Sequence, residues 1–359
     1  MERSRFHIDK SLLYALLMLA GLSMIILYSA SAKDAGTTGA HFVRLALGFA
    51  VLFGIAQIRP ELLERWAPWI FAAGLILVAA VLGVGAISKG AQRWLRFGGV
   101  QFQPSEIMKI AVPLMLAWFL ARGGLPPTWP RVLLALVITL VPAALIAKQP
   151  DLGTALLVTA SGLFVLFLAG LRTRLIVIAF GLLGAAMPII WNRLHAYQRN
   201  RVLTLIDPAA DPLGTGYHTL QSMIALGSGG FYGKGWLNSS QAHLEYLPES
   251  QTDFIFAVFG EEFGLIGILL VVALYGFIAA RSLLISFYAQ DTFSRLLAGG
   301  LALEFFVQFF VNIGMVAGIL PVVGVPLPMM SYGGTSILTL MAGFGMLMSI
   351  QTNRKIVEF

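Results

Sequence analysis

Ten stretches of the chain are apolar, and each is about as long as a helix needs to cross a bilayer core, ~20 residues. They fall near residues 11–31, 40–58, 66–88, 104–121, 131–147, 152–170, 174–192, 254–280, 296–318 and 326–350. Backbone groups in hydrocarbon must bond within their own segment, so these stretches predict membrane-spanning helices. The first stretch continues through residues 12–28 without a small-residue cleavage site, and we interpret it as the first span.

The composition supports an all-α polytopic membrane protein, organised as a single transmembrane domain over residues 1–359. Of the 359 residues, 58% are hydrophobic and 11% are charged, whereas soluble proteins carry roughly 25% charged residues. With so few charges, most of the surface must face lipid. The chain has no cysteine, which excludes disulfides and thiolate metal sites, and its five histidines are too far apart in sequence to predict a metal cluster.

The positions of the basic residues predict the orientation. The net charge of +7 would suit nucleic-acid binding or basic cytoplasmic loops, and the distribution favours the second, so we expect no nucleic-acid partner. With both termini in the cytoplasm, the following residues fall on that side: Arg3, Arg5, Lys10, Arg59, Arg65, Arg122, Arg131, Arg172, Arg174, Arg281, Arg295, Arg354 and Lys355. Short loops rich in Lys and Arg stay inside.

Another group of basic residues falls on the opposite side. It comprises Lys89, Arg93, Arg96, Lys148, Arg193, Arg199, Arg201 and Lys234. Two interpretations stay open: solvated loop charges, or an outward-facing site for a phosphate-bearing substrate. Several of these residues lie in the large polar segment 193–252, between the seventh and eighth spans. It is rich in aromatic residues and is not of low complexity, so we expect it to fold on the membrane face with short helices.

The glycine-rich segment 227–235 (GSGGFYGKG) is not a nucleotide-binding phosphate loop. That motif needs Ser or Thr after the lysine and a strand before the loop, and here Gly235 follows Lys234. We expect the glycines to serve tight turns or a close approach of the backbone to a ligand.

Asp253 is the best catalytic candidate, because it lies where the long polar segment becomes the eighth span. The alternative is structural: Ser250 and Asp253 have the spacing of a capping box at a helix start. Glu245 and Glu249 are rival acids in the same segment.

Within the spans, Glu106 and Lys109 share a helix face, and they form either a packing ion pair or part of a site.

Two further features lie near the C-terminus. Glu304, Gln308 and Asn312 recur every four residues and form a polar stripe, which serves either interhelical packing or function. The last span begins with Pro321, Pro326 and Pro328, followed by SYGGTS at 331–336. Irregular backbone at membrane depth persists only when it is buried or lines a cavity, so we expect a broken or re-entrant element.

Four motifs together resemble the SEDS family, the shape, elongation, division and sporulation proteins of bacteria. They are PSEIMK at 104–109, QPDLGT at 149–154, LPESQTDF at 247–254, and the spaced series from Asn312 through MMSYGGTS at 329–336. The segments 197–201 and 216–236 are similar to the elongation members of that family. The resemblance covers nearly the whole chain.

The resemblance implies a peptidoglycan glycosyltransferase that polymerises lipid II at the outer face of the bacterial cytoplasmic membrane during elongation. It implies Asp253 as the essential carboxylate, which we interpret as the general base, and Glu106 and Lys109 as a buried pair. It also implies a class B penicillin-binding protein and other elongation proteins as partners. A supporting or substrate-binding role is expected for Arg93, Arg96, Arg199, Arg201, Lys234, Glu249 and Ser331, with Mg²⁺ or another divalent cation as a possible cofactor. The alternatives are a lipid II flippase and a non-catalytic scaffold.

Overall fold

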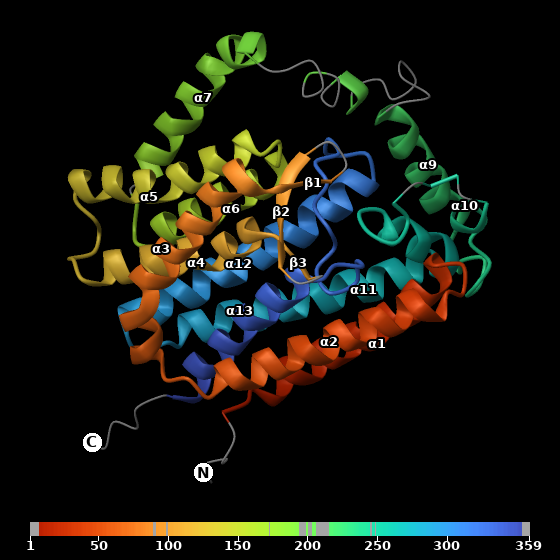
Figure 1. The fold of residues 1–359 in the computed structure, drawn as a ribbon, viewed down its shortest axis with the longest axis horizontal. Coiled ribbons are helices and arrows are strands. Elements are labelled where there is room, and N and C mark those ends of the chain that lie inside the picture. Colours follow the sequence, from red (N-terminus) through yellow and green to blue (C-terminus); the bar gives the residue numbers. More distant parts are fainter. Residues whose placement is uncertain are drawn as a thin grey trace.

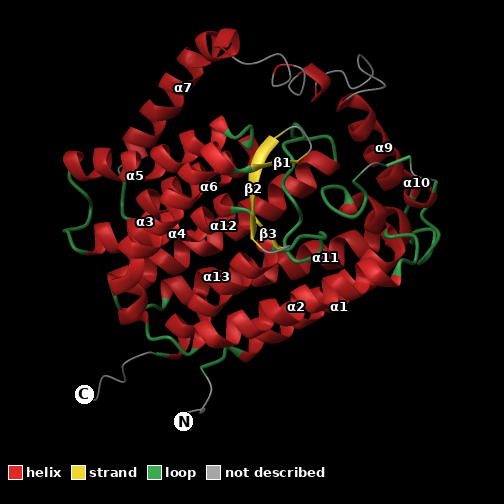
Figure 2. Cartoon of the chain, in the orientation of Figure 1, coloured by secondary structure: helices red, strands yellow, loops and turns green. Residues whose placement is uncertain are grey.

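Helices dominate the computed structural model, which describes residues 7–88, 91–97, 100–171, 173–193, 199, 203–205, 215–244, 246–247 and 249–353 (Figures 1 and 2). The helices are α1 (Lys10–Ala30), α2 (Ala35–Ala56), α3 (Pro60–Val84), α4 (Pro104–Ala121), α5 (Trp129–Lys148), α6 (Leu152–Leu168), α7 (Thr173–Arg193), α9 (Thr215–Ser228), α10 (Ser240–His243), α11 (Ile255–Phe287), α12 (Thr292–Val316) and α13 (Thr335–Thr352).

The expected spans correspond to α1–α7 and α11–α13, which confirms an all-α polytopic membrane protein. Within the described residues, eight helices are at least 18 residues long and apolar enough to cross a membrane. Those eight leave out α6, which has 17 residues, and α7, which has 21. Large apolar side chains cover the outer surface, for example Trp69 and Ile76, which are 70% and 67% exposed. Such a surface is suited to lipid rather than to water.

The helices pack around α4 and α12. Both helices contact α6 and α13, while α2 lies along α13, α1 and α12 lie along α11, and α3 lies along α4. Figure 1 shows α7, in green, leaning away from this bundle. Because α4 and α12 are the two most deeply buried spans, polar side chains on them are shielded from lipid.

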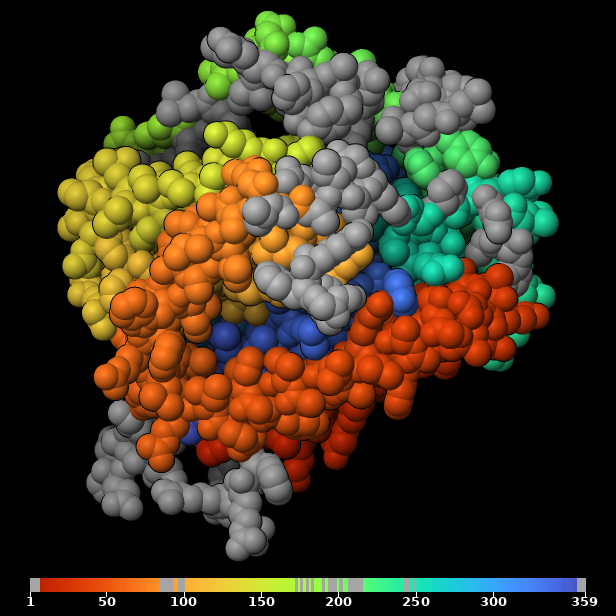
Figure 3. Space-filling model, in the orientation of Figure 1, coloured from red at the N-terminus to blue at the C-terminus, as the bar shows by residue number. Residues whose placement is uncertain are grey.

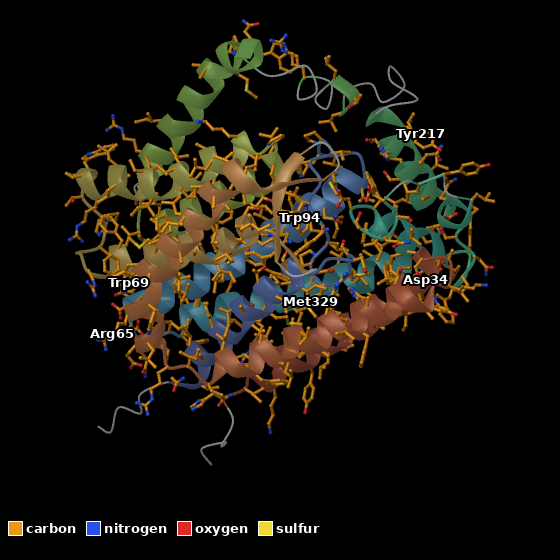
Figure 4. The ribbon with its side chains drawn as sticks, viewed as in Figure 1. Asp34, Arg65, Trp69, Trp94, Tyr217 and Met329 are labelled. Carbon is orange, nitrogen blue, oxygen red and sulfur yellow. The ribbon has the colours of Figure 1, made fainter. Side chains whose placement is uncertain are left out.

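The two ends of the bundle are clearly distinguished. His7 Nδ1 lies 3.1 Å from Thr352 Oγ1, so both ends of the described chain meet at one end, which we call the terminal end. Arg65 and Trp69 lie toward this end, and Asp34 and Tyr217 lie on the opposite side, which we call the α9 end (Figure 4). Trp236 Nε1 donates to the carbonyl of Ile25 at 3.1 Å, which fastens the long polar segment to α1. In its described part, this segment forms the expected short helices.

Three short strands between α3 and α4 were not expected. β1 (Ala86–Ser88), β2 (Ala91–Phe97) and β3 (Val100–Phe102) form an antiparallel sheet in that order. Ile87 pairs with Gln92, and Arg96 pairs with Gln101. The sequence of β2, AQRWLRF, does not alternate regularly between polar and apolar residues, and the strand is short, so it gave no signal between two long apolar stretches.

The expected irregular element before the last span is confirmed. After α12 ends at Val316, the chain is not helical again until α13 begins at Thr335. Gly318 and Gly324 adopt φ values of +71° and +74°, which disfavour any residue with a Cβ atom. We call residues 317–334 the irregular segment.

Candidate active site

Asp253 lies in a tight turn rather than at the first residues of a helix. The backbone N–H groups of Thr252 and Phe254 donate to the carbonyl of Glu249 at 3.0 and 3.3 Å, which closes a turn over residues 249–254. The N-cap of α11 is Phe254, and no side chain caps it. The capping-box interpretation is therefore wrong, because a box starting at Ser250 requires helical backbone from residue 251, where the chain instead turns.

The irregular segment supports this turn from behind. Ser331 Oγ donates to the carbonyl of Thr252 at 2.5 Å and accepts from the N–H of Leu327 at 2.8 Å. The N–H of Tyr332 donates to the carbonyl of Gln251 at 2.8 Å. The backbone on the N-terminal side of Asp253 is thus fixed at two successive residues. Ser331 therefore acts on Asp253 through the backbone in this structure.

The polar stripe on α12 connects the turn to the bundle interior. Asn312 Nδ2 donates to the carbonyl of Asp253 at 2.9 Å and to that of Val325 at 2.7 Å. One turn further, Gln308 Nε2 donates to the carbonyl of Pro326 at 3.4 Å. These amides satisfy backbone carbonyls that an irregular segment in a membrane protein would otherwise leave unpaired. At Asn312 and Gln308 the stripe therefore holds the irregular segment in place.

Glu106 and Lys109 form a buried ion pair deeper in the bundle. Lys109 Nζ lies 2.7 Å from Glu106 Oε2, and both side chains are about 5% exposed. Lys109 also lines a cavity of about 20 Å³ with Glu304, Gln308, Ser336 and Thr339, which has room for one water molecule. Glu304 and Asn312 are eight residues apart, or about 12 Å along α12. The pair therefore lies well below the Asp253 turn.

His218 lies beside the turn, and the sequence offered no signal for it beyond its isolated position. Its ring stacks on Phe254, with centroids 5.8 Å apart and planes 15° apart. Burial lowers the pKa of His218 below its usual value of 6.5, although nearby Glu249 acts in the opposite direction. The imidazole thus packs on Phe254 as an aromatic surface at the end of the turn.

The predicted basic residues occupy different surroundings. Arg93 on β2 donates to the carbonyls of Gln149 and Pro150, and its guanidinium lies 3.9 Å from Asp151. Arg199 donates to the carbonyls of Trp191 and Asn192, each at 2.9 Å. The side chain of Arg96, and Arg201 as a whole, lie outside the described residues. Arg93 therefore docks the strands onto the α5–α6 turn, and Arg199 closes the end of α7.

The glycine-rich segment is inserted into a break in α11. At Gly264 the backbone has φ +64° and ψ −166°, which interrupts the helix. A continuous helix would bond Leu265 N–H to the carbonyl of Glu261, and Ile266 N–H to that of Glu262. Instead these N–H groups donate to the carbonyls of Gly230 and Phe231, at 2.9 and 3.2 Å.

The same insertion satisfies the two carbonyls that the break leaves over. The N–H groups of Lys234 and Gly235 donate to the carbonyls of Glu261 and Glu262, each at 3.0 Å. A Cβ atom on Gly233 would lie 2.1 Å from the Glu262 carbonyl oxygen, so only glycine fits there. The close approach expected for these glycines is therefore an approach to the protein's own helix.

Glu261 anchors the inserted segment through its side chain, which is fully buried. Its carboxylate lies 2.6 Å from Lys234 Nζ and accepts from the hydroxyls of Ser239 and Ser240 at 2.5 and 2.7 Å. Backbone N–H groups of Ser240 and Gln241 donate to it at 3.2 and 3.3 Å. The charge of Lys234, which is 34% exposed, is thus compensated within the chain.

Replacing Glu261 with alanine should destabilise the protein by about 2–4 kcal/mol, because several buried donors lose their acceptor. The ion pair with Lys234 contributes only a small part of this loss of stability, since the lysine side chain is partly solvated. Thermal unfolding of the purified protein in detergent would measure the change. Glu61→Ala, an exposed acid on α3, is the matched control, and an equal shift in the two variants would contradict this assignment.

The predicted site residues thus form two groups. Asp253, Glu249 and Ser331 come together at the turn before α11, whereas Glu106 and Lys109 lie deeper and connect to it through α12. Lys234, Arg93 and Arg199 are each bonded elsewhere. Among the side chains that the structure describes, no group of three or more His, Cys, Asp or Glu residues is close enough to hold a metal ion.

The fold and this site define a polytopic membrane protein that presents a carboxylate at the start of a broken span, above a buried ion pair. The chain belongs to the cell cycle protein family of FtsW, RodA and SpoVE, whose model matches residues 9–356. This is the family that the four motifs resemble, and the match covers nearly all of the chain.

Named relatives are similar over the same length. The peptidoglycan glycosyltransferase MrdB of Escherichia coli K12 is 54% identical over 355 residues, covering 99% of this chain and 96% of that protein. MrdB of Helicobacter pylori 26695 is 38% identical over 368 residues, covering 100% of this chain and 93% of that protein.

Solved structures share the fold. A chain from a study of the structural coordination of polymerization and crosslinking by a peptidoglycan synthase complex aligns with a TM-score of 0.85, at 31% identity, covering 97% of this chain and 98% of its own. The rod shape determining protein RodA of Thermus thermophilus aligns with a TM-score of 0.74, at 29% identity, with 98% of both chains covered.

Proposed function

We propose that this chain polymerises lipid II into glycan strands at the outer face of the bacterial cytoplasmic membrane during cell elongation, with Asp253 as the general base. The chain is a peptidoglycan glycosyltransferase, as are by name relatives that are 54% and 38% identical to it. The observation that carries the role of Asp253 is its place in a braced turn, where it does not cap α11.

The proposed reaction is a single displacement. The Asp253 carboxylate takes the proton of the acceptor's sugar hydroxyl as that oxygen attacks the anomeric carbon of the donor. The new glycosidic C–O bond forms as the bond to the diphosphate oxygen breaks, and undecaprenyl diphosphate leaves with the electron pair. A positioned base contributes about 10²–10⁴-fold, or roughly 3–5 kcal/mol of the barrier. One displacement inverts the anomeric centre.

The bracing of the turn serves this reaction because a base must be held within hydrogen-bond reach of its proton. Ser331 and Asn312 bond to the carbonyls of Thr252 and Asp253, so they position the backbone that carries the base. Glu106 and Lys109 lie too deep to reach the same proton, and we assign them a supporting role. Glu249, in the same turn, is the alternative base.

A divalent cation is part of the proposal only as a partner of the substrate's diphosphate. Mg²⁺ in such sites is commonly held by one or two carboxylates together with substrate phosphates. Glu249, an exposed carboxylate in the same turn, would hold such an ion beside the base, and the ion would offset diphosphate charge. Polymerisation measured with and without a chelator tests whether a divalent cation is required.

The proposed partner is a class B penicillin-binding protein, which would cross-link the strands that this chain makes, within the wider elongation machinery. Support comes from the structural neighbour, which belongs to a complex that coordinates polymerization and crosslinking. The deciding experiment is polymerisation of lipid II by the purified protein, with and without this transpeptidase. If neither sample makes glycan, the proposed function is wrong.

A lipid II flippase is the competing proposal, and a non-catalytic scaffold is a third. A flippase needs a path for a polar headgroup through the bundle and has no need of a base at its outer end. The glycosyltransferase is favoured because the full-length relatives are named for that activity. Flippase activity would be measured as movement of labelled lipid II across vesicles, and neither rival needs a base at residue 253.

The proposed orientation places the α9 end outside the cell and both termini in the cytoplasm. A cysteine at Tyr232, which is 84% exposed, should be labelled by an impermeant maleimide on intact spheroplasts. The chain has no other cysteine, so the signal is specific. Ser240 is less suitable because its hydroxyl bonds to Glu261. A cysteine at Glu61, at the terminal end, is the control, and labelling of that residue alone would reverse the topology.

A further inference from the structure

An arginine lies inside the second span, where the sequence analysis named no site residue. Arg44 is the tenth residue of α2, about 14 Å along the helix from its start at the α9 end. Its neighbours on the helix, Phe42, Val43 and Leu47, are large, apolar and more than half exposed, as expected for a face toward lipid. A charged residue at such a depth is costly to insert into a membrane and is usually functional.

Arg44 has no counter-charge within the described part of the chain. Its guanidinium forms neither an ion pair nor a hydrogen bond with any described residue, and its carbon Cζ lies 4.1 Å from the centroid of the Tyr332 ring. Arg44 lies at the edge of the buried face of α2 and is itself only partly buried. The cation–π contact fixes the direction of the side chain but leaves its five N–H donors available.

The ring that holds Arg44 belongs to the site. Tyr332 is bonded through its N–H to Gln251, two residues before Asp253, and its ring also stacks on buried His41 with centroids 6.2 Å apart. Arg44 Nε also lies 3.8 Å from the position of a Cβ atom on Gly334, the residue before α13. Arg44 is distant from Asp253 in sequence. In the fold, Tyr332 connects the two, because its ring contacts Arg44 and its N–H bonds to the turn that carries Asp253.

The surface here is hollowed rather than flat. In Figure 3 the C-terminal part of the chain, in blue, is visible at the bottom of a hollow between α2 on one side and α3 on the other. The residues that begin α13 also line the small cavity beside Lys109. The irregular segment and the start of α13 therefore lie between Arg44 and the buried ion pair.

Arg44 differs in its bonding from the cations that the sequence analysis selected. Lys109 and Lys234 have carboxylate partners at 2.7 and 2.6 Å, and Arg93 and Arg199 donate to backbone carbonyls. A cation that must bind an exogenous anion is best left without an internal acceptor, since breaking a buried pair is strongly unfavourable. By this criterion Arg44 is better placed to bind an anion than these four.

We propose that Arg44 binds the diphosphate of a polyprenyl-linked substrate or of the leaving group, while the prenyl chain lies against the apolar face of α2. This inference rests on the proposed function and adds a binding residue to it. A guanidinium matches phosphate oxygens in a bidentate geometry that an ammonium lacks. Placed at membrane depth, it selects an anion that is attached to a lipid chain.

The test is binding of farnesyl diphosphate to the purified full-length protein in nanodiscs of zwitterionic lipid. Arg44→Gln should raise the Kd at least tenfold, and Arg44→Lys, which keeps the charge and the fold, about threefold or more. Tyr332→Phe should bind like the wild type, whereas Tyr332→Leu should weaken binding because the guanidinium loses its platform. Arg122→Gln is the matched control, since Arg122 lies 4.2 Å from the Trp118 ring but at the other end of the bundle.

Each contrary outcome is specific. An unchanged Kd in Arg44→Gln, or in Arg44→Lys should the glutamine variant fail to fold, would refute the inference, as would an equal loss in Arg122→Gln. Tight binding of inorganic pyrophosphate would show a site for a free anion and would refute the role of the lipid chain. If phosphatidylglycerol in the nanodiscs abolishes the difference in Kd between the wild type and Arg44→Gln, the site binds an ordinary phospholipid headgroup and the inference is wrong. Binding is measured without turnover, so absence of polymerisation would refute the proposed function and leave this inference standing.

Discussion

Asp253→Asn should reduce lipid II polymerisation at least 10²-fold while the protein stays folded. Asparagine keeps the size of the side chain and one oxygen acceptor, but a neutral amide does not take up a hydroxyl proton at physiological pH. The turn should be retained because it is closed by backbone bonds to Glu249, Thr252 and the Asp253 carbonyl, none of which the substitution removes. Glycan synthesis by the purified variant, compared with its binding of lipid II, is the measurement.

Asp34→Asn is the matched control for that substitution. Asp34 is a true N-cap, whose carboxylate accepts from the N–H groups of Gly36 and Thr37 at the start of α2. Asparagine is an equally good N-cap, so this variant should keep its stability and its activity. Near-normal synthesis by a folded Asp253→Asn protein would remove Asp253 from the mechanism, and Glu249→Gln would then be the variant to test.

Breaking the buried ion pair should produce the largest loss of stability. Removing one member of such a pair costs about 3–5 kcal/mol, because the other charge stays buried without a partner. Lys109→Ala should be the worse of the two single substitutions, since it leaves Glu106 and the nearby Glu304 without a cation. In Glu106→Ala, Glu304 remains beside the lysine. Thermal unfolding in nanodiscs would rank the variants.

The double substitution Glu106→Ala/Lys109→Ala decides whether the two side chains act as a pair. It removes both charges, so it should be better folded than Lys109→Ala alone even though a cavity remains. Polymerisation should fall together with stability in the single variants and recover in part with stability in the double one. A double variant that is no more stable than Lys109→Ala would show that the two residues are not coupled.

The spans, the irregular segment and the Glu106–Lys109 pair were predictable because each depends on local sequence. Apolar length defines a span, prolines interrupt a helix, and a spacing of three residues places an acid and a base on one helix face. The roles of Asp253 and Ser331 followed only from the family resemblance, and their contact was not predictable, since the 77 residues between them carry no local signal of it.

What the sequence did not reveal depends on contacts between distant segments. The capping box at Ser250 was a valid local pattern, but hydrogen bonds from Ser331 and Tyr332 stabilise a turn there instead. The importance of Arg44 depends on Tyr332, which lies far along the chain. Lys234 was expected to support or bind the substrate, but its charge is paired with Glu261, which lies in another segment of the chain. Each of these outcomes required the packing of the whole bundle.

The break in α11 has a consequence for how the protein is made. Two N–H groups and two carbonyls of this span are satisfied only by residues 230–235, which precede it in the chain. Until those residues have folded back, the same four groups can bond to one another in a continuous helix, Leu265 to Glu261 and Ile266 to Glu262, so the span can enter the membrane unbroken. The break in the eighth span therefore forms only when the polar segment before it docks. A larger residue at Gly233 or Gly264 should keep residues 230–235 from docking, which would leave them open to proteolysis outside the bundle.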